Sequence, residues 1–279
     1  MESRKRWRES ILLKTALTIA GSDSSGGAGI QADLKTFSAL GVYGMSAITA
    51  ITAQNTCGVT NIRELDIAII QEQIAAIYTD IPVHAVKIGM LSSAAIVRTV
   101  ADALLKQQAK NIVLDTVMIS KHGHHLLKKE AVSALKECLL PLALVVTPNL
   151  LEASEIVDFA VEDRAGMEKA AVAIKAMGPQ YVVIKGGHLP GNACDLLYDG
   201  QELVTFTNER IDTIHTHGTG CTFSSAIAAG LSKGLTVMEA VSEAKKYITM
   251  AITHGFSLGK GIGPTHHFYE LYERAGLFK

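Results

Sequence analysis

The chain has 279 residues, of which 48% are hydrophobic, 5% aromatic and 19% charged, with a formal net charge of −1. This length and hydrophobic content are sufficient for a large core, in one α/β domain or in two small ones. The balanced charge and the few aromatic residues exclude an electrostatic or stacking basis for binding nucleic acid or an anionic membrane. A charge-free apolar run of about 18 residues, as a membrane-spanning helix requires, is absent from the sequence.

The four cysteines have neither zinc-site spacing nor the pattern of a disulfide framework, so we expect free thiols and a cytoplasmic protein. Residues 1–14 differ in composition, because they contain five basic residues and the only tryptophan, Trp7. We expect residues 1–14 to form a loosely ordered basic tail. Residues 15–279 contain no repeat and no Pro/Gly/Ser-rich linker, which predicts a single domain.

From residue 15 onward, short apolar runs alternate with longer helical patterns. The candidate strands are residues 16–20, 46–52, 85–88, 112–115, 144–147 and 181–184. The candidate helices are residues 31–40, 68–78, 94–107, 130–140, 167–177, 221–233 and 237–253. A Tyr-Asp-Gly turn between short strand-like runs predicts an edge hairpin near residues 195–205. The whole pattern predicts an α/β fold with a mostly parallel sheet and helices on both faces.

Polar and glycine-rich residues follow each of the six predicted strands. These segments are residues 21–29, 54–56, 89–90, 115, 147–149 and 185–188. In parallel α/β sheets, ligands bind beyond the carboxyl ends of the strands. The sequence therefore predicts one ligand site at that edge of the sheet.

Residues 216–223, Thr-His-Gly-Thr-Gly-Cys-Thr-Phe, place a glycine-rich turn before an apolar helix. The open backbone N–H groups and the positive end of the helix favour an anion, most plausibly a phosphate. Cys221 stands at the helix start, where we expect a stabilised thiolate and a candidate base. An ordinary glycine-rich helix start is the alternative interpretation.

Residues 27–32, Gly-Ala-Gly-Ile-Gln-Ala, match the loose dinucleotide-binding fingerprint. A nicotinamide or flavin enzyme would also need an acidic residue at the end of the second strand, but that strand ends at Gln54. The P-loop pattern is absent, so a kinase would have to bind phosphate through residues 218–221 and Lys185. A solvated surface charge is the alternative for Lys185, although the two following glycines favour close approach of a ligand.

Asn149 and Glu152 are three residues apart at a predicted helix start, so their side chains share one face. Such oxygen ligands suit Mg²⁺, although these residues alone favour a capping box. A cysteine hydrolase would pair Cys221 with His215 or His217, but no motif supplies the orienting group. The histidines at 122, 124, 125, 266 and 267 lack structural-zinc spacing, which favours a surface or gating role.

Together these motifs resemble the hydroxymethylpyrimidine/phosphomethylpyrimidine kinases of thiamine biosynthesis, members of the ribokinase-like superfamily. The similar segments are residues 16–23, 26–33, 53–56, 87–90, 115–118, 147–149, 185–188, 216–221 and 263–264. The resemblance implies a three-layer sandwich and phosphorylation of a hydroxymethyl aminopyrimidine, then of its monophosphate, with ATP and Mg²⁺. It also implies a cytoplasmic homodimer that binds a small-molecule substrate, without nucleic-acid or membrane partners.

The same resemblance assigns roles to individual residues. Gln54 is expected to bind the pyrimidine edge, and the residues expected to line or approach the ring pocket are Asp23, Ala28, Asp33, Met90 and Val117. The implied catalytic residues are Lys185, Gly218, Gly220 and Cys221. The implied ATP-binding residues are Lys185, Asp115, Thr219 and Gly220, and the implied metal-binding residues are Asn149 and Glu152.

Two other functions remain open from the sequence. A pyridoxal kinase of the same superfamily is the nearest alternative, although an amide at Gln54 can both donate to and accept from an aminopyrimidine. A non-catalytic pyrimidine-binding protein would be expected to lack the anion site, the lysine or the metal element, and all three are present. We further expect the histidine-rich segment 121–125 to form a mobile cover over the site.

Overall fold

The computed structural model describes residues 13–118, 129–187 and 189–278. Within these residues the centre is a nine-stranded sheet with the order β3-β2-β1-β4-β5-β6-β7-β8-β9. The strands from β2 to β7 pair in parallel, and β3, β8 and β9 are antiparallel to their neighbours. The bounds are β1 (Thr15–Asp23), β2 (Tyr43–Asn55), β3 (Gly58–Glu64), β4 (Ala85–Ile88), β5 (Ile112–Leu114), β6 (Val145–Val146), β7 (Tyr181–Gly186), β8 (Ala193–Tyr198) and β9 (Leu203–Asn208).

The six predicted strands and the edge hairpin are confirmed. The side chain of Asp199 forms the hairpin turn, since its Oδ1 accepts hydrogen bonds from the backbone of Gln201 and Glu202 at 2.7 Å each. Sequence patterning did not indicate β3, because this edge strand is polar and largely exposed. Without a buried face, a strand has no apolar alternation to mark it.

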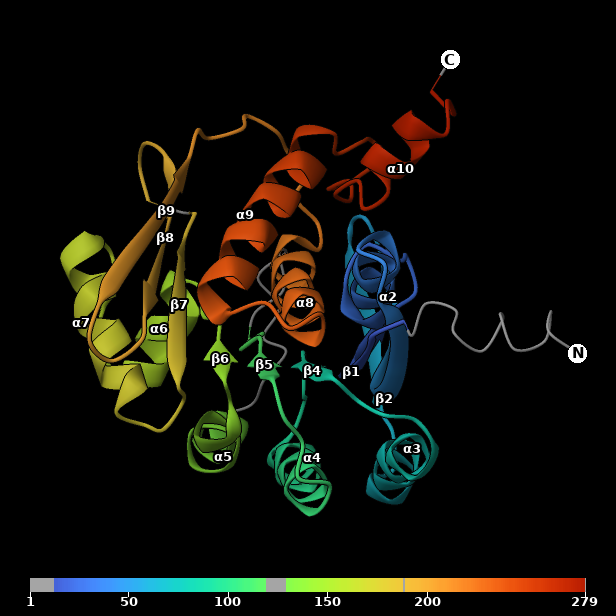
Figure 1. Ribbon diagram of the computed structural model, residues 1–279, viewed down its shortest axis with the longest axis vertical. Helices are drawn as coiled ribbons and strands as arrows, with labels where there is room; N and C mark the ends of the chain where they lie inside the picture. The colour runs from blue at the N-terminus through green and yellow to red at the C-terminus, as the bar shows by residue number, and fades with distance from the viewer. Residues whose placement is uncertain (1–12, 119–128, 188, 279) are drawn as a thin grey trace, which may run out of the picture.

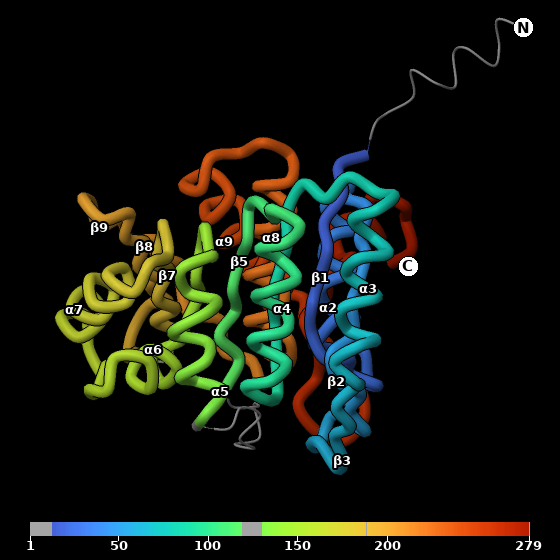
Figure 2. The backbone as a smooth tube through the Cα atoms, turned by 90° about the horizontal axis from the view of Figure 1, so that it is seen from below, coloured from blue at the N-terminus to red at the C-terminus, as the bar shows by residue number. Residues whose placement is uncertain are grey.

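Helices cover both faces of the sheet (Figure 1). On one face lie α2 (Gly29–Ala39), α8 (Thr219–Ser232) and α9 (Val237–Thr253). On the other face lie α3 (Ile67–Asp80), α4 (Ala94–Lys106), α5 (Lys129–Ala134), α6 (Leu150–Val157) and α7 (Arg164–Lys175). Figure 2 shows this second layer side by side across the sheet. Each layer buries its own apolar cluster against the strands, which confirms the three-layer architecture.

The predicted helices are present, with differences at their ends. The helix expected over residues 130–140 is α5 followed by a π-helical turn, Leu135–Leu139. The sequence marked only the start of α6, at Asn149, and it did not indicate α10 (Tyr269–Arg274). No residue of α10 is buried, so its sequence has no apolar stripe to reveal it.

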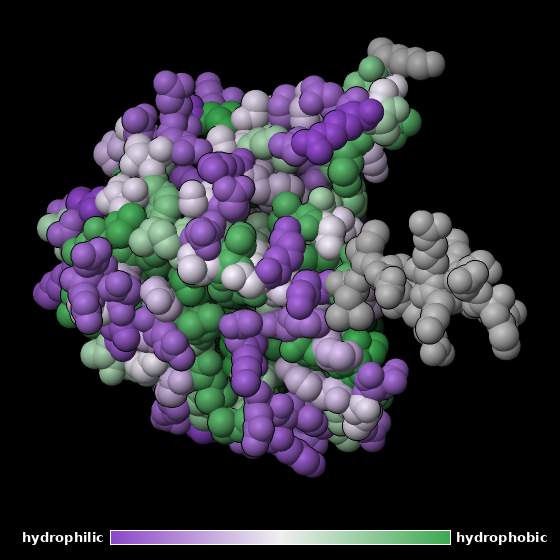
Figure 3. Space-filling model, viewed as in Figure 1, coloured by the Kyte–Doolittle hydropathy of each residue, from purple (hydrophilic) through white to green (hydrophobic). Residues whose placement is uncertain are grey.

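The described surface is mixed in character. On the face shown in Figure 3, hydrophilic residues are widely spread and hydrophobic residues gather mainly near the middle. Among the described helices, none is long and apolar enough to cross a membrane. All four cysteines are free, as predicted. Residues 1–12 of the predicted tail and the predicted cover at residues 121–125 lie outside the described residues.

Candidate active site

A cavity of about 570 Å³ lies at the carboxyl edge of the sheet, where the sequence predicted a ligand site. Its walls come from the loop after β1, the ends of β2 and β7, the start of α6, the start of α8 and one side of α9. The predicted site residues that line it are Asp23, Ala28, Gln54, Met90, Asp115, Val117, Asn149, Glu152, Lys185, Gly218, Thr219, Gly220 and Cys221. The topology thus brings together segments almost 200 residues apart.

The turn before α8 depends on two glycines for different reasons. Gly218 has φ +81°, and a Cβ there would lie 1.8 Å from the carbonyl oxygen of Gly27, so only glycine fits. A Cβ on Gly220 would lie 3.5 Å from Lys185 Nζ and 3.7 Å from Asp115 Oδ2, which is ordinary contact. Gly220 therefore keeps space open between the helix N-terminus and the Lys185 ammonium, where an anion is favoured.

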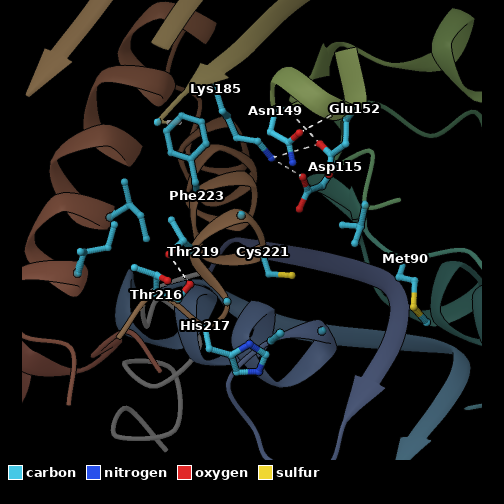
Figure 4. A pocket seen from close by; sticks show the side chains of 18 of the residues that line it. Met90, Asp115, Asn149, Glu152, Lys185, Thr216, His217, Thr219, Cys221 and Phe223 are labelled. Atoms are coloured by element: carbon cyan, nitrogen blue, oxygen red, sulfur yellow. Dashed lines mark hydrogen bonds and ion pairs between the residues drawn. The ribbon is translucent and has the colours of Figure 1, made fainter. Parts of the chain in front are cut away.

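A buried charge cluster faces this turn (Figure 4). Lys185 Nζ lies 3.0 Å from Asp115 Oδ1 and 3.9 Å from Glu152 Oε2. The Asp115 carboxylate also accepts hydrogen bonds from Ser224 and Thr147 at 3.1 and 3.3 Å. Burial opposes ionisation of Asp115, but the charges of Lys185 and Lys87 and the hydrogen bonds from Lys185 and Ser224 together lower its pKa. The cluster therefore holds the Lys185 ammonium group in a fixed position, where it can form an ion pair with a phosphate that enters the cavity.

Asn149 and Glu152 form the capping box of α6. Asn149 Oδ1 accepts from the Glu152 backbone at 3.0 Å, and Glu152 Oε2 accepts from the Asn149 backbone at 2.8 Å. Glu152 Oε2 also accepts from the hydroxyl of Thr116 at 3.1 Å. Burial raises the pKa of Glu152 to about 7, even though Lys185 favours its ionised form. The capping interpretation is thus correct, and Glu152 nevertheless lines the cavity.

Cys221 differs from the sequence-based expectation. We expected the helix N-terminus to stabilise a thiolate, but burial raises the pKa of the Cys221 thiol to about 11, and the carboxylates of Asp33 and Asp115 act in the same direction. The favourable charge of Lys87 is insufficient to reverse this effect. Cys221 is therefore a neutral thiol in the free protein at pH 7.

Two aspartates expected in the ring pocket have structural partners. Asp23 lines the cavity, but its oxygens accept hydrogen bonds from Ser25, Gly27 and Ala28 at 2.7–3.1 Å. Asp33 does not line the cavity, which corrects the expectation. It is fully buried and binds Thr18 and Ser225 at 2.6 Å and Lys87 Nζ at 3.0 Å. A carboxylate in this environment needs such a partner, and this one holds Lys87 in the cavity wall.

The sequence indicated no role for Lys87 or Thr116, and it suggested His217 only as the base of a cysteine hydrolase. Each of them lies within a quoted motif (residues 87–90, 115–118 and 216–221), so the motifs marked the region but not the roles of these side chains. His217 donates to Asp23 Oδ2 at 2.8 Å, but among the described residues no hydrogen bond joins its ring to the neutral thiol of Cys221, which argues against a cysteine hydrolase. Among the described residues, no group of three or more His, Cys, Asp or Glu side chains is arranged to hold a metal ion.

The comparison with known proteins agrees with this site. A family model described as phosphomethylpyrimidine kinase matches residues 23–266. The chain belongs to this family. A hydroxymethylpyrimidine/phosphomethylpyrimidine kinase of Rhizobium meliloti is 53% identical over 262 residues, which cover 92% of this chain and 98% of the relative.

Two further similarities extend the family assignment. A thiamine biosynthesis bifunctional protein of Geobacter sulfurreducens is 47% identical over 254 residues, which cover 91% of this chain and 52% of the relative. A pyridoxal kinase of Bacillus subtilis, solved as an ADP complex, is 46% identical with a TM-score of 0.87, and the match covers 93% of this chain and 99% of that structure. The ribokinase-like fold predicted from the sequence is thereby confirmed.

Proposed function

We propose that this member of the phosphomethylpyrimidine kinase family transfers phosphate from ATP to the hydroxymethyl group of 4-amino-5-hydroxymethyl-2-methylpyrimidine. The same site then phosphorylates the monophosphate to the diphosphate, for thiamine biosynthesis. The observation that carries this proposal is that one cavity is lined by Gln54, by Lys185 and by the start of α8 with Cys221. The family match and the named relatives support it.

The described residues favour transfer by positioning. Phosphoryl transfer passes through a loose transition state that needs alignment and charge neutralisation more than covalent chemistry. The Lys185 ammonium and the backbone of Thr219 and Gly220 stabilise the charge on the transferring phosphate. The substrate oxygen forms the new P–O bond as the bond from the γ-phosphorus to ADP breaks. Because the Cys221 thiol is protonated, the hydroxyl proton leaves late, after the oxygen has gained phosphoryl character, and the thiol relays it to an oxygen of the transferred phosphoryl group.

We propose that Mg²⁺ accompanies ATP in this site. The donor set fits a hard cation, because the carboxylate oxygens of Asp115 and Glu152 line the cavity. These two carboxylates share a single ammonium group, that of Lys185. Glu152 would hold the ion, largely through water, and Asn149 would act by fixing Glu152 through the capping box. The cation supplies neutralisation of phosphate charge.

The test is a turnover assay with ATP and Mg²⁺ that offers the aminopyrimidine alcohol and pyridoxal separately and resolves monophosphate from diphosphate. We expect the pyrimidine diphosphate as the main product. Pyridoxal phosphate alone would overturn the assigned ring and favour the second candidate, to which the similarity with the Bacillus subtilis pyridoxal kinase points. Transfer to neither ring would leave a pyrimidine-binding protein as the better interpretation.

We also propose that the chain forms a homodimer through the β2–β3 edge of the sheet. Three large hydrophobic side chains of this region, Ile51, Ile67 and Ile69, are each at least 41% exposed. Exposed apolar side chains grouped at one edge are typical of a protein interface.

A further inference from the structure

Two glycine-rich motifs of the sequence meet at one buried histidine. His217 is 6% exposed, and its Nε2 lies 2.8 Å from Asp23 Oδ2. Its ring packs directly on the loop after β1, since a Cβ on Gly27 would lie 2.2 Å from His217 Cδ2. The same Nε2 atom lies 3.4 Å from Gln54 Nε2. In Figure 4 the ring lies beneath the Thr216–Thr219 turn, on the opposite side of the cavity from Lys185.

The backbone of His217 is fixed independently of its ring. His217 N donates to the carbonyl of Gly263 at 3.1 Å, and the backbone N of Thr265 donates to the carbonyl of His217 at 3.3 Å. Asp23 is fixed as well, because it accepts bonds from the backbone of Gly27 and Ala28 through the same Oδ2. Anchors at both ends leave the imidazole one orientation.

This orientation determines which hydrogen-bonding group faces Gln54. Nε2 carries at most one hydrogen, and the carboxylate at 2.8 Å is its partner, so we assign that hydrogen to the bond with Asp23. Nε2 then has no lone pair to accept a hydrogen from Gln54. Two nitrogens that both carry hydrogen would then face each other at 3.4 Å, so the imidazole favours the Gln54 amide rotated by 180°, with its oxygen toward His217.

Thr52 favours the same orientation from the other flank of the amide. Its hydroxyl hydrogen is donated to the carbonyl of Ser22 at 2.8 Å, so Thr52 Oγ1 can act toward Gln54 only as an acceptor. Oγ1 lies 3.2 Å from Gln54 Oε1, so an acceptor at this position favours the amide rotated by 180°, with its oxygen and nitrogen exchanged. The amide nitrogen is the group that an acceptor favours there. With both flanks defined, the outer edge of the amide offers one acceptor and one donor to the cavity, in a fixed order.

We propose that His217, held by Asp23, is a positioning residue that fixes the Gln54 amide and so selects a ring with an amino group beside a ring nitrogen. Such a ring matches the amide edge with two hydrogen bonds, whereas a pyridine ring without that amino group can make only one. The inference rests on the proposed function and adds the residue that determines its ring specificity.

The test compares His217→Leu, which removes both nitrogens, with His217→Gln, whose amide N–H can again donate to Asp23. His215→Leu is the matched control, because the buried His215 Nδ1 has no hydrogen-bond partner within the described residues. For His217→Leu we expect the KM for the aminopyrimidine to rise about tenfold while kcat changes less than about threefold. The preference for the aminopyrimidine over pyridoxal should fall by about the same factor, and His217→Gln should restore most of it.

A merely structural role gives a different pattern. If His217 only holds the phosphate turn, kcat and the KM for ATP change while the ring preference stays constant, and the proposal is overturned. A wild-type measurement decides independently of any variant: ¹⁵N NMR of His217 should show a hydrogen on Nε2, and an unprotonated Nε2 would contradict the mechanism. If the wild-type protein phosphorylates neither ring, the proposed function fails, and this NMR result with a pyrimidine-binding titration still tests the positioning of Gln54.

Discussion

At the scale of single residues, burial determines the protonation state of Cys221. A helix N-terminus and Lys87 both favour a thiolate, yet burial raises the thiol pKa to about 11. A residue in this state is a poor base and a poor nucleophile before substrate binds. Its contribution to phosphoryl transfer must therefore come while the substrate hydroxyl is already aligned with ATP.

The neutral state of the Cys221 thiol predicts the kinetic effect of the Cys221→Ala substitution. Loss of the thiol should lower kcat by about 100-fold, the lower end of what a side chain that takes part in proton transfer contributes. The KM for the pyrimidine should change less than about threefold, because Gln54 and the apolar side chains of Met90 and Val117 still line the ring pocket. Steady-state kinetics with Cys194→Ala as the control variant provide the measurement. Near-normal turnover of Cys221→Ala would remove this residue from the mechanism.

At the scale of elements, the two glycines at the start of α8 have different roles, because the fold requires Gly218 and the anion site requires Gly220. Gly220→Ala places its methyl group in ordinary contact with Lys185 and Asp115, so the protein should fold with unchanged thermal stability. The methyl group would occupy the anion space, and we expect kcat/KM for ATP to fall by about 100-fold.

Gly218→Ala is the counterpart of this variant. Its Cβ would overlap the carbonyl oxygen of Gly27 at 1.8 Å, in a backbone conformation that alanine disfavours. We expect a loss of at least about 2 kcal/mol of stability, measured by denaturant unfolding. Equal stability of the two variants would contradict this division of roles.

The contact between Thr222 of α8 and His267 predicts that the stability of the protein depends on pH. His267 is buried, its Nε2 and Thr222 Oγ1 form a hydrogen bond at 3.0 Å, and burial lowers its pKa from 6.5 to about 3. Between pH 3 and 6.5 the unfolded chain binds the extra proton, so this residue makes stability rise with pH in that window and costs stability as pH falls. Its slope approaches about 1.4 kcal/mol per pH unit.

The variant His267→Gln keeps an acceptor for Thr222 but removes the titration. We therefore expect the acid branch of its stability curve to be flatter than that of the wild type between pH 6.5 and 3. Urea unfolding at several pH values gives the comparison, and His254→Gln serves as a control that retains the buried imidazole. Parallel curves for His267→Gln and wild type would show that another group sets the acid branch.

The sequence predicted these elements to different extents. The buried parallel strands were predicted because both of their faces require apolar residues, as in β1 and β4. β3 and α10 have little or no buried surface, so their residues carry no periodic signal. The π-helical turn after α5 was likewise beyond prediction, because it differs from an α-helix in hydrogen bonding and not in apolar pattern.

The site was predicted at the level of its motifs and less well at the level of single atoms. The strand-end pattern placed Gln54, Lys185 and Gly220 at one cavity, because topology alone brings strand ends together. It could not show that Asp33 is paired beneath the cavity or that Cys221 is neutral. Both depend on burial and on partners distant in sequence, which spacing does not encode.

At the scale of the whole molecule, the two edges of the sheet differ in what they expose. Near the β2–β3 edge, Ile51, Ile67 and Ile69 are 50%, 41% and 43% exposed. At the opposite edge, Leu203 on β9 is 39% exposed and provides a matched position. A homodimer through the β2–β3 edge would bury the three isoleucines, each contributing about 1–2 kcal/mol.

The two edges make the proposed dimer testable with one substitution at each. In a two-fold symmetric interface every substitution occurs twice, so Ile51→Asp would bury two unpaired carboxylates. We expect it to weaken dimerisation by at least about 100-fold, while Leu203→Asp leaves dimerisation unchanged. Sedimentation velocity over a range of protein concentrations measures both variants, and turnover of the separated Ile51→Asp protein shows whether one chain is active alone. A dimer that Leu203→Asp disrupts and Ile51→Asp does not would place the interface at the β9 edge instead.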